Sequence, residues 1–397
     1  MKRRATPAVI MVVAAVAVVV VLVVALRAGL DGDGSAVDGA DGEPAAGAEV
    51  SGVSFDTAGW RTDFSKHSAP LEEFISGGPP RDGIPPLDDP TFVAVGAEEI
   101  DDREPVVAIE IDGQARAYPL QILIWHEIVN DELAGRKVAV TFCPLCYTAV
   151  AFDRMLDGRE LTFGTTGNLR FSDLVMWDRQ TESWWQQFSG EAVVGELTGK
   201  RLDQVPAQLI SMGEFASRYP DGEQLSRDTG HDRPYGDNPY QGYDDIDQPP
   251  FLLEGAELDQ RLQPKARVVT VEGGRDFVAV PFAALREQRV INAKVGPLPF
   301  VAWWRPGTTS ALNASTIRDS DDVGSAVVLD RRVDGRVLTF EEAGDTLRDR
   351  ETGTTWNAAG EAVEGALLGE RLRRVPHDAP FWFAVGAFRP DARIVDA

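Results

Sequence analysis

Apolar and polar residues alternate with a period of two from Val106 onward, which is the pattern of half-buried β-strands. The run VVAIEIDGQARAYPL predicts two strands joined by a tight turn at Asp112 and Gly113. Further strands are predicted at RKVAVTF, YTAVAF and RELTFGTTGNL, whereas ILIWHEIV is short enough to form a helix or a strand. The pattern therefore predicts a mainly β fold and leaves an α+β arrangement open.

The tryptophan-rich run SDLVMWDRQTESWWQQFSGE shows the same alternation. Leu174 and Met176 alternate with Val175 and Trp177, so a strand here has two faces with different neighbours. This pattern fits either an aromatic binding pocket or an ordinary β-core. We favour the β-core because large apolar side chains are mostly buried.

The strand-rich pattern occurs twice along the chain. Five short motifs recur in the same order: VAIE (107–110) as VTVE (269–272), GRELTF (158–163) as GRVLTF (335–340), DRQT (178–181) as DRET (349–352), GEAV (190–193) as GEAV (360–363), and GKRLDQVP (199–206) as GERLRRVP (369–376). Matches that keep their order predict two related β-rich units that arose by internal duplication. The second unit contains no cysteine and no counterpart of Trp125, His126 and Glu127.

Composition suggests where these units begin and end. The N-terminal part beyond residue 28 is rich in Gly, Ala and acidic residues, and the segment SGGPPRDGIPPLDDP contains too much Pro and Gly for regular structure. Clustered Asp, Pro, Gly and Tyr after residue 225 predict a long loop or linker. The predicted organisation is an anchor (1–28), an acidic stalk (29–57), a first β-rich unit (58–225), a loop or linker (226–255) and a second β-rich unit (256–397).

The N-terminus has the pattern of a transmembrane helix. Three basic residues precede an unbroken apolar run from Ala8 to Leu26, which as a helix would span roughly 28 Å of a ~30 Å hydrocarbon core. Residues 30–60 contain acids and no Lys or Arg, so the positive-inside rule places the N-terminus in the cytoplasm. We therefore predict a single-pass cell-membrane protein with an extracytoplasmic C-terminal bulk, and leave a cleaved signal peptide open.

Charge and missing motifs exclude several function classes. The formal net charge of -24 lacks the basic footprint that nucleic-acid binding needs. The sequence contains no Walker loop, and Tyr147 follows Cys146 where a haem-attachment motif requires His. We therefore expect no nucleotide, no haem and no nucleic-acid partner, and the membrane is the one partner that the sequence indicates.

The candidate chemistry lies at Cys143 and Cys146, the two cysteines of the chain, which form a CPLC motif between two predicted strands. No helical pattern follows, as it would in a thioredoxin-like dithiol. A turn between strands instead resembles a knuckle in which two thiolates bind one metal, and such a site needs further ligands. His126 is the first candidate, and Glu127 and Met176 are others. These donors suit copper or zinc, so we predict metal binding by Cys143, Cys146 and His126.

The cysteines and the histidine could also have purely structural roles. The two cysteines of an exported protein can instead form a local disulfide, and a histidine in an apolar run is often a core residue bonded to backbone. Tyr147 stands where a knuckle usually has Gly, whose positive φ turns backbone N–H groups toward sulfur. Two function classes therefore remain: a protein for metal or redox handling, and a non-catalytic binding module with a structural disulfide. No catalytic residue is predicted, and enzyme activity stays undecided.

Several longer segments resemble a known family. These are GWRTDFSKHSAPLEEFISGGPPRDGIPPLDDPTF, AYPLQILIWHEIVND, VTFCPLCYTAVAF, GNLRFSDLVMWDRQTESWWQQFSGEAVVG and TGHDRPYGDNPYQGY. From about residue 58 to at least 245 the chain is similar to the DUF3179 family of exported or membrane-anchored proteins, which has no settled activity. The resemblance implies that His126, Cys143 and Cys146 belong to a shared constellation, and it names no reaction.

Overall fold

The computed structural model of the chain describes residues 53–395. The predicted transmembrane helix (8–26) and most of the predicted stalk lie outside these residues. Within 53–395, every helix is too short or too polar to cross a bilayer.

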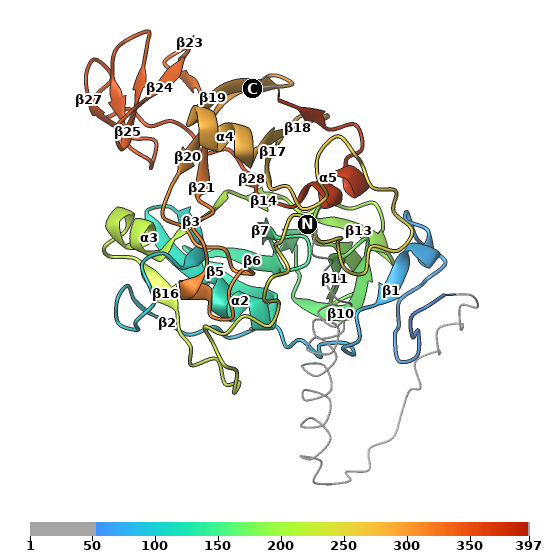
Figure 1. The fold of residues 1–397 in the computed structure, drawn as a ribbon. Helices are drawn as coiled ribbons and strands as arrows, with labels where there is room; N and C mark the ends of the chain where they lie inside the picture. The colour runs from blue at the N-terminus through green and yellow to red at the C-terminus, as the bar shows by residue number, and fades with distance from the viewer. Residues whose placement is uncertain (1–52, 396–397) are drawn as a thin grey trace, which may run out of the picture.

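The first half of the described chain consists of strands with three short helical segments (Figure 1). In chain order they are η1 (Leu71–Glu73), β1 (Phe74–Ser76), β2 (Phe92–Ala94), β3 (Pro105–Ile111), β4 (Gln114–Pro119), α2 (Leu120–His126), β5 (Ile128–Leu133), β6 (Arg136–Cys143), β7 (Thr148–Asp153), β8 (Met155–Leu156), β9 (Arg159–Glu160), β10 (Phe163–Arg170), β11 (Asp173–Asp178), β12 (Trp184–Gln186), β13 (Glu191–Val194), β14 (Gln204–Val205), β15 (Ala207–Ser211), α3 (Met212–Arg218) and β16 (Glu223–Leu225).

Three sheets organise this half. Their strand orders are β15-β3-β4-β16-β2, β14-β7-β6-β5 and β1-β10-β11-β12-β13. The predicted hairpin joins β3 to β4, and its turn residues Asp112 and Gly113 have φ values of 49° and 80°. Positive φ at both central residues is the geometry that favours an Asp-Gly pair, so this prediction is confirmed. The ambiguous ILIWHEIV run forms the end of helix α2 and the start of strand β5.

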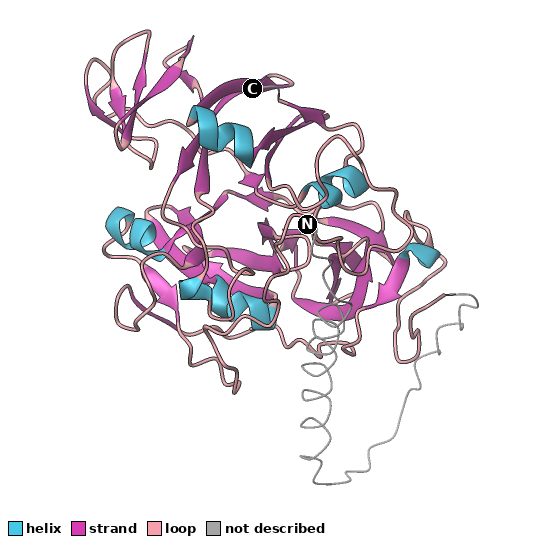
Figure 2. Cartoon of the chain, viewed as in Figure 1, coloured by secondary structure: helices cyan, strands magenta, loops and turns pink. Residues whose placement is uncertain are grey.

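The second half follows a stretch, residues 226–267, that contains no helix or strand. Its elements are β17 (Val268–Gly273), β18 (Asp276–Pro281), α4 (Phe282–Gln288), β19 (Val290–Val295), β20 (Leu298–Arg305), η2 (Ile317–Asp319), β21 (Ser325–Asp330), β22 (Arg332–Val333), β23 (Arg336–Val337), β24 (Phe340–Ala343), β25 (Thr346–Asp349), β26 (Thr355–Trp356), β27 (Ala362–Glu364), β28 (His377–Asp378), α5 (Trp382–Phe388) and β29 (Arg393–Ile394). The cartoon shows how strands dominate both halves (Figure 2), so the mainly β prediction is confirmed.

The two halves share much of their order of elements and some of the same hydrogen bonds. The Asp178 carboxylate accepts bonds from the Thr181 hydroxyl and from the Trp185 indole at 2.9 Å. The carboxylate of Asp349 accepts the same two bonds from Thr352 and Trp356, again with the indole at 2.9 Å. We call the two halves the first unit (through β16) and the second unit (from β17).

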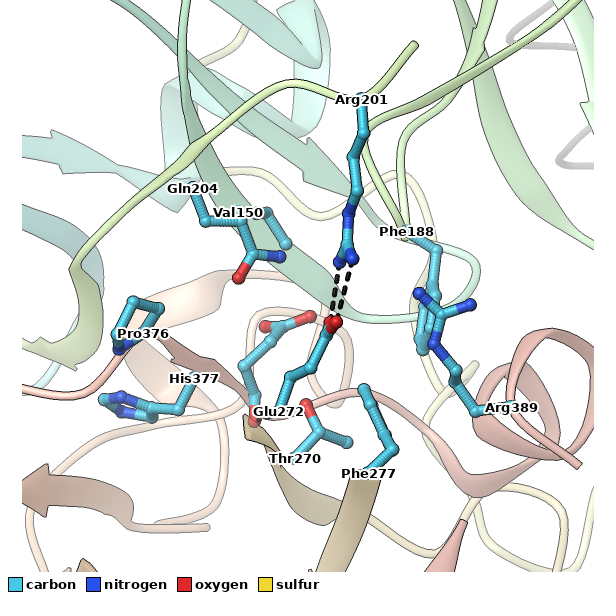
Figure 3. A pocket seen from close by; sticks show the side chains of 11 residues that line it. Val150, Phe188, Arg201, Gln204, Thr270, Glu272, Phe277, Pro376, His377 and Arg389 are labelled. Carbon is cyan, nitrogen blue, oxygen red and sulfur yellow. Dashed lines mark hydrogen bonds and ion pairs between the residues drawn. The ribbon is translucent and has the colours of Figure 1, made fainter. Parts of the chain in front are cut away.

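The units share a hydrophobic core and a polar interface. Helix α5 contributes Trp382 and Phe383 to the same buried cluster as Phe142 of β6. A cavity of about 20 Å³ lies between the units, and Figure 3 shows Arg201 of the first unit pointing at Glu272 of the second. Their paired hydrogen bonds measure 2.8 and 2.6 Å, so the interface is joined by a bidentate ion pair.

Strand β11 shows that the tryptophan-rich run is an ordinary β-core. Leu174 and Met176 lie in the large cluster that contains Phe142. Val175 and Trp177 face the other way and pack with aromatic residues of the N-terminal segment, including Trp60. One strand therefore separates two hydrophobic clusters, as its alternating pattern predicts.

Candidate metal centre

The CPLC motif begins at Cys143, the last residue of β6, and continues into the four-residue turn 144–147 that leads to β7. Tyr147 at its end has φ of 58°, the left-handed conformation for which the knuckle geometry favours Gly. Its side chain is buried, its hydroxyl accepts a bond from the Ala311 amide at 3.2 Å, and the Arg267 guanidinium lies 4.7 Å from its ring centre. Surrounding contacts thus hold a strained residue directly after Cys146.

A third residue joins the two cysteines. The ligand atoms of Cys143, Cys146 and Asp173 lie within 4.8 Å of one another, and all three residues are buried. The Cys146 thiol donates to Asp173 Oδ1 at 2.9 Å, and the other carboxylate oxygen accepts the Phe188 amide at 3.0 Å. The two thiols are free, so no disulfide joins them.

The hairpin between β10 and β11 places Asp173. Its two turn residues, Phe171 and Ser172, have φ values of 52° and 62°, although neither is glycine. This turn directs the Ser172 carbonyl to 3.8 Å from Cys143 Sγ and starts β11 at Asp173. This conformation costs free energy for a residue other than glycine, and such strained residues tend to occur at functional sites.

A chain of polar side chains also contacts Cys146. Thr148 Oγ1 lies 2.9 Å from Cys146 Sγ and donates to the Gln187 side-chain carbonyl. The amide of Gln187 donates in turn to Thr141 Oγ1 at 2.8 Å. The threonine, glutamine and second threonine therefore fix one another, and they orient Cys146 without contributing a charge.

The electrostatics of the site favour neutral groups until a cation binds. Burial raises the pKa of both thiols, and it raises the pKa of Asp173 to about 6. Glu127 is also buried; desolvation and then the charge of Asp173 raise its pKa to about 8. No salt bridge among residues 53–395 includes Glu127 or Asp173. Two thiols and two carboxyl groups thus share a region with no basic partner.

His126 lies outside this group. Its Nδ1 lies 2.7 Å from the Pro85 carbonyl and its Nε2 lies 2.6 Å from the Tyr235 hydroxyl. A carbonyl only accepts, so Nδ1 is the protonated nitrogen and Nε2 accepts from the phenol. Burial lowers the pKa of His126 to about 4, which keeps the ring neutral. Both ring nitrogens have partners, as in a core histidine bonded to backbone.

The hydroxyl chain beyond His126 leads to the surface. Tyr235 also bonds to the hydroxyl of Thr229, which lines a cavity of about 260 Å³ together with His231, Asp88 and other residues. The other two candidate ligands are buried: Met176 lies in the large hydrophobic cluster, and Glu127 is near enough for its charge to raise the pKa of Cys143. Glu127 does not belong to the group within 4.8 Å.

The sequence profile of one protein family, described as a protein of unknown function (DUF3179), matches residues 81–392. The chain belongs to the DUF3179 family. The match covers most of the chain and extends through the second unit, well beyond residue 245. No curated protein and no solved structure matches this DUF3179 chain.

Asp173 is the member of the group that sequence reasoning missed, although the DUF3179 chain contains a signal for it. The stretch from Phe163 to Asp178 is longer than the matching stretch from Phe340 to Asp349 by six residues. The extra residues lengthen the β10–β11 hairpin, and Asp173 lies in that extension. A comparison of the two units therefore points to the longer hairpin, whereas only the fold shows that Asp173 contacts the cysteines.

Proposed function

We propose that this DUF3179 protein binds one zinc ion through Cys143, Cys146 and Asp173 and acts in metal handling outside the cytoplasm. The observation that supports it is the buried grouping of these three ligand atoms within 4.8 Å, with free thiols. Burying acidic donors without a basic partner is costly, and a bound cation removes that cost. Asp173 replaces His126 in the proposed ligand set because both nitrogens of His126 already have partners.

The donor set fits zinc better than copper(I). Two thiolates suit either metal, whereas a carboxylate is a hard ligand that suits zinc and disfavours copper(I). The Cys146 sulfur and the Asp173 oxygen are now 2.9 Å apart. Zinc–ligand bonds of ~2.0–2.3 Å would require this distance to increase by less than ~1 Å. Three protein ligands leave a fourth position for water or for the nearby Glu127 carboxylate. When bound, the ion would hold both thiols as thiolates.

The proposal also includes a membrane anchor and an internal duplication. The Ala8–Leu26 run supports a single-pass membrane anchor with both units outside the cytoplasm. The shared order of elements and the matching Asp178 and Asp349 hydrogen bonds support an internal duplication. In this proposal the first unit kept the metal site and the second lost it.

The decisive experiment counts metal and thiols in the purified ectodomain, residues 53–397. Elemental analysis should give about one zinc per chain, and thiol titration in denaturant should find two free thiols without reduction. Absence of metal, with thiols that appear only after reduction, would contradict the proposal. That outcome would favour the alternative, a non-catalytic binding module whose CPLC motif forms a structural disulfide.

A further inference from the structure

The second unit contacts the CPLC turn directly. The amide of Phe381, just before helix α5, donates to the carbonyl of Cys146 at 2.9 Å. The carboxylate of Asp378 accepts the amide of Ala149, near the start of β7, at 2.9 Å. The Tyr147 hydroxyl accepts the Ala311 amide. Contacts from the second unit therefore hold the chain at Cys146 and at the residues that follow it.

Asp378 is itself held rigidly in the fold. It lies on β28, which pairs with β17, and it lines the cavity between the units. The same oxygen that accepts the Ala149 amide also accepts the Ala379 amide, at 2.7 Å. One carboxylate oxygen thus joins the start of β7 to the segment that leads into Phe381.

These contacts act on a residue that needs positioning. Cys146 is followed by Tyr147 in a strained conformation, which persists only when surrounding contacts enforce it. Ala149 and Cys146 lie on either side of Tyr147 and Thr148, so fixing both limits the movement of the turn. The direction of Cys146 Sγ then depends on the second unit as well as on β6 and β7.

We propose that Asp378 is a positioning residue for the metal site, through which the second unit sets how tightly the cysteine turn retains its ion. This inference rests on the proposed zinc site. In other metal sites, residues that orient the ligands typically contribute 10–100-fold to metal affinity. On this basis the second unit, which has no cysteine, still takes part in metal binding.

The test compares two aspartates of the second unit. Asp378→Ala removes the link to Ala149, whereas Asp349→Ala removes a carboxylate that bonds only within the second unit, to Thr352, Thr354 and Trp356. Zinc loss to a chromophoric chelator and the visible spectrum of the cobalt(II)-substituted protein are measured for each. Asp378→Ala should accelerate zinc loss about 10–100-fold and shift the cobalt bands. Asp349→Ala should lower stability and leave both readouts near wild type.

Two further variants keep the test decisive. Asp378→Asn retains an acceptor oxygen and should restore both readouts, and Tyr147→Phe, which loses only the Ala311 contact, should accelerate zinc loss by less than Asp378→Ala. An unchanged spectrum and release rate in Asp378→Ala would overturn the inference. If Asp378→Ala does not fold, a Tyr147→Phe protein with wild-type zinc loss overturns it. Wild-type protein that takes up no zinc or cobalt refutes the proposed site itself, which is a separate outcome.

Discussion

The two units connect the same pair of strands in different ways. In the first unit, β6 and β7 are joined by the four residues 144–147, which include one cysteine and abut the other. In the second unit, β20 and β21 are as long as β6 and β7, but nineteen residues, 306–324, join them. That loop reaches back over the first unit, where Ala311 and Leu312 enter the shared core. The two strand pairs are alike. The loop that joins the strands carries a thiol in the first unit and core-packing residues in the second.

The other parts of the site differ in the same way. The residue after helix α2 is Glu127, and the residue after the matching helix α4 is Arg289; both have positive φ. Glu127 is buried near Asp173, whereas Arg289 forms an ion pair with Glu342 at 2.9 Å. The buried acidic residue Glu127 of the first unit therefore corresponds in the second unit to a basic residue, Arg289, which is paired with a carboxylate.

One face of the tryptophan-bearing sheet differs in residue composition between the two units, because within residues 53–395 a chain segment covers it only in the first. In the first unit, Trp177 and Trp184 pack against the N-terminal segment at Phe55, Trp60 and Phe64. Their counterparts in the second unit, aligned through the matching Asp–Trp bonds, are Arg348, which is exposed, and Thr355, which is partly exposed. The sheet of β24–β27 lies at the edge of the molecule (Figure 1). Apolar residues thus occur on the covered face and polar ones on the open face.

The largest expected effect tests the difference in stability between these two sheet faces. Trp184→Ala removes a fully buried ring that contacts four aromatic neighbours and should lower the free energy of unfolding by about 3–5 kcal/mol. The matched change Thr355→Ala should cost less than about 1 kcal/mol. Urea unfolding of both variants measures the difference. Equal losses would show that the N-terminal segment contributes little to the first unit.

The second effect concerns the ligands that only the first unit has. Cys146→Ser should weaken zinc binding by more than ~100-fold because a thiolate ligand is lost. Asp173→Asn should also weaken it, and by more than His126→Gln, because Asp173 lies beside the thiols and His126 does not. Competition with a zinc chelator ranks the three variants. A larger loss for His126→Gln than for Asp173→Asn would restore His126 as the ligand.

The third effect is the pH dependence of metal binding. Both thiols have a raised pKa and are protonated at neutral pH, so zinc must displace two protons. Affinity should therefore fall about 100-fold per pH unit on acidification near neutral pH. Below the Asp173 pKa of about 6, a third proton should steepen the loss. Zinc affinity measured from pH 5 to 8 tests both slopes, and Asp173→Asn should lack the steeper part.

The smallest effect is a difference in how stability depends on pH at Glu127 and at its counterpart Arg289. Burial raises the folded-state pKa of Glu127 to about 8, so its contribution to stability is complete below the unfolded pKa of ~4.3 and is lost as pH rises through about 8. Glu127→Gln should therefore stabilise the metal-free protein at pH 9 by about 1–3 kcal/mol relative to wild type. Arg289→Gln should change stability by less than about 1 kcal/mol with no new pH dependence. Unfolding curves at pH 5, 7 and 9 decide between them.

Local patterns predicted those features that depend on neighbours in the chain. The Asp112-Gly113 turn, the two faces of β11 and the turn between β6 and β7 all follow from short-range rules. Asp173 escaped prediction because its contact with Cys146 spans 27 residues and depends on how two hairpins pack.

Tyr147 shows a second limit of sequence reasoning. Its positive φ opposes its own preference and is imposed by Arg267, which directly precedes β17, and by Ala311 and Phe381 of the second unit. For the same reason the sequence could suggest His126 as a ligand but could not show that Pro85 and Tyr235 occupy its nitrogens. Long-range partners decide both cases.

The bond between Ala149 and Asp378 has a consequence for the timing of biosynthesis. The two residues are 229 positions apart, which at ~5–20 residues per second corresponds to roughly 10–45 s of translation. During this interval the nascent chain already contains both cysteines, while the residues that shield their turn have yet to be made. We expect the thiols to be most open to oxidants and to incoming metal in this period, and least open once the second unit has folded against the turn.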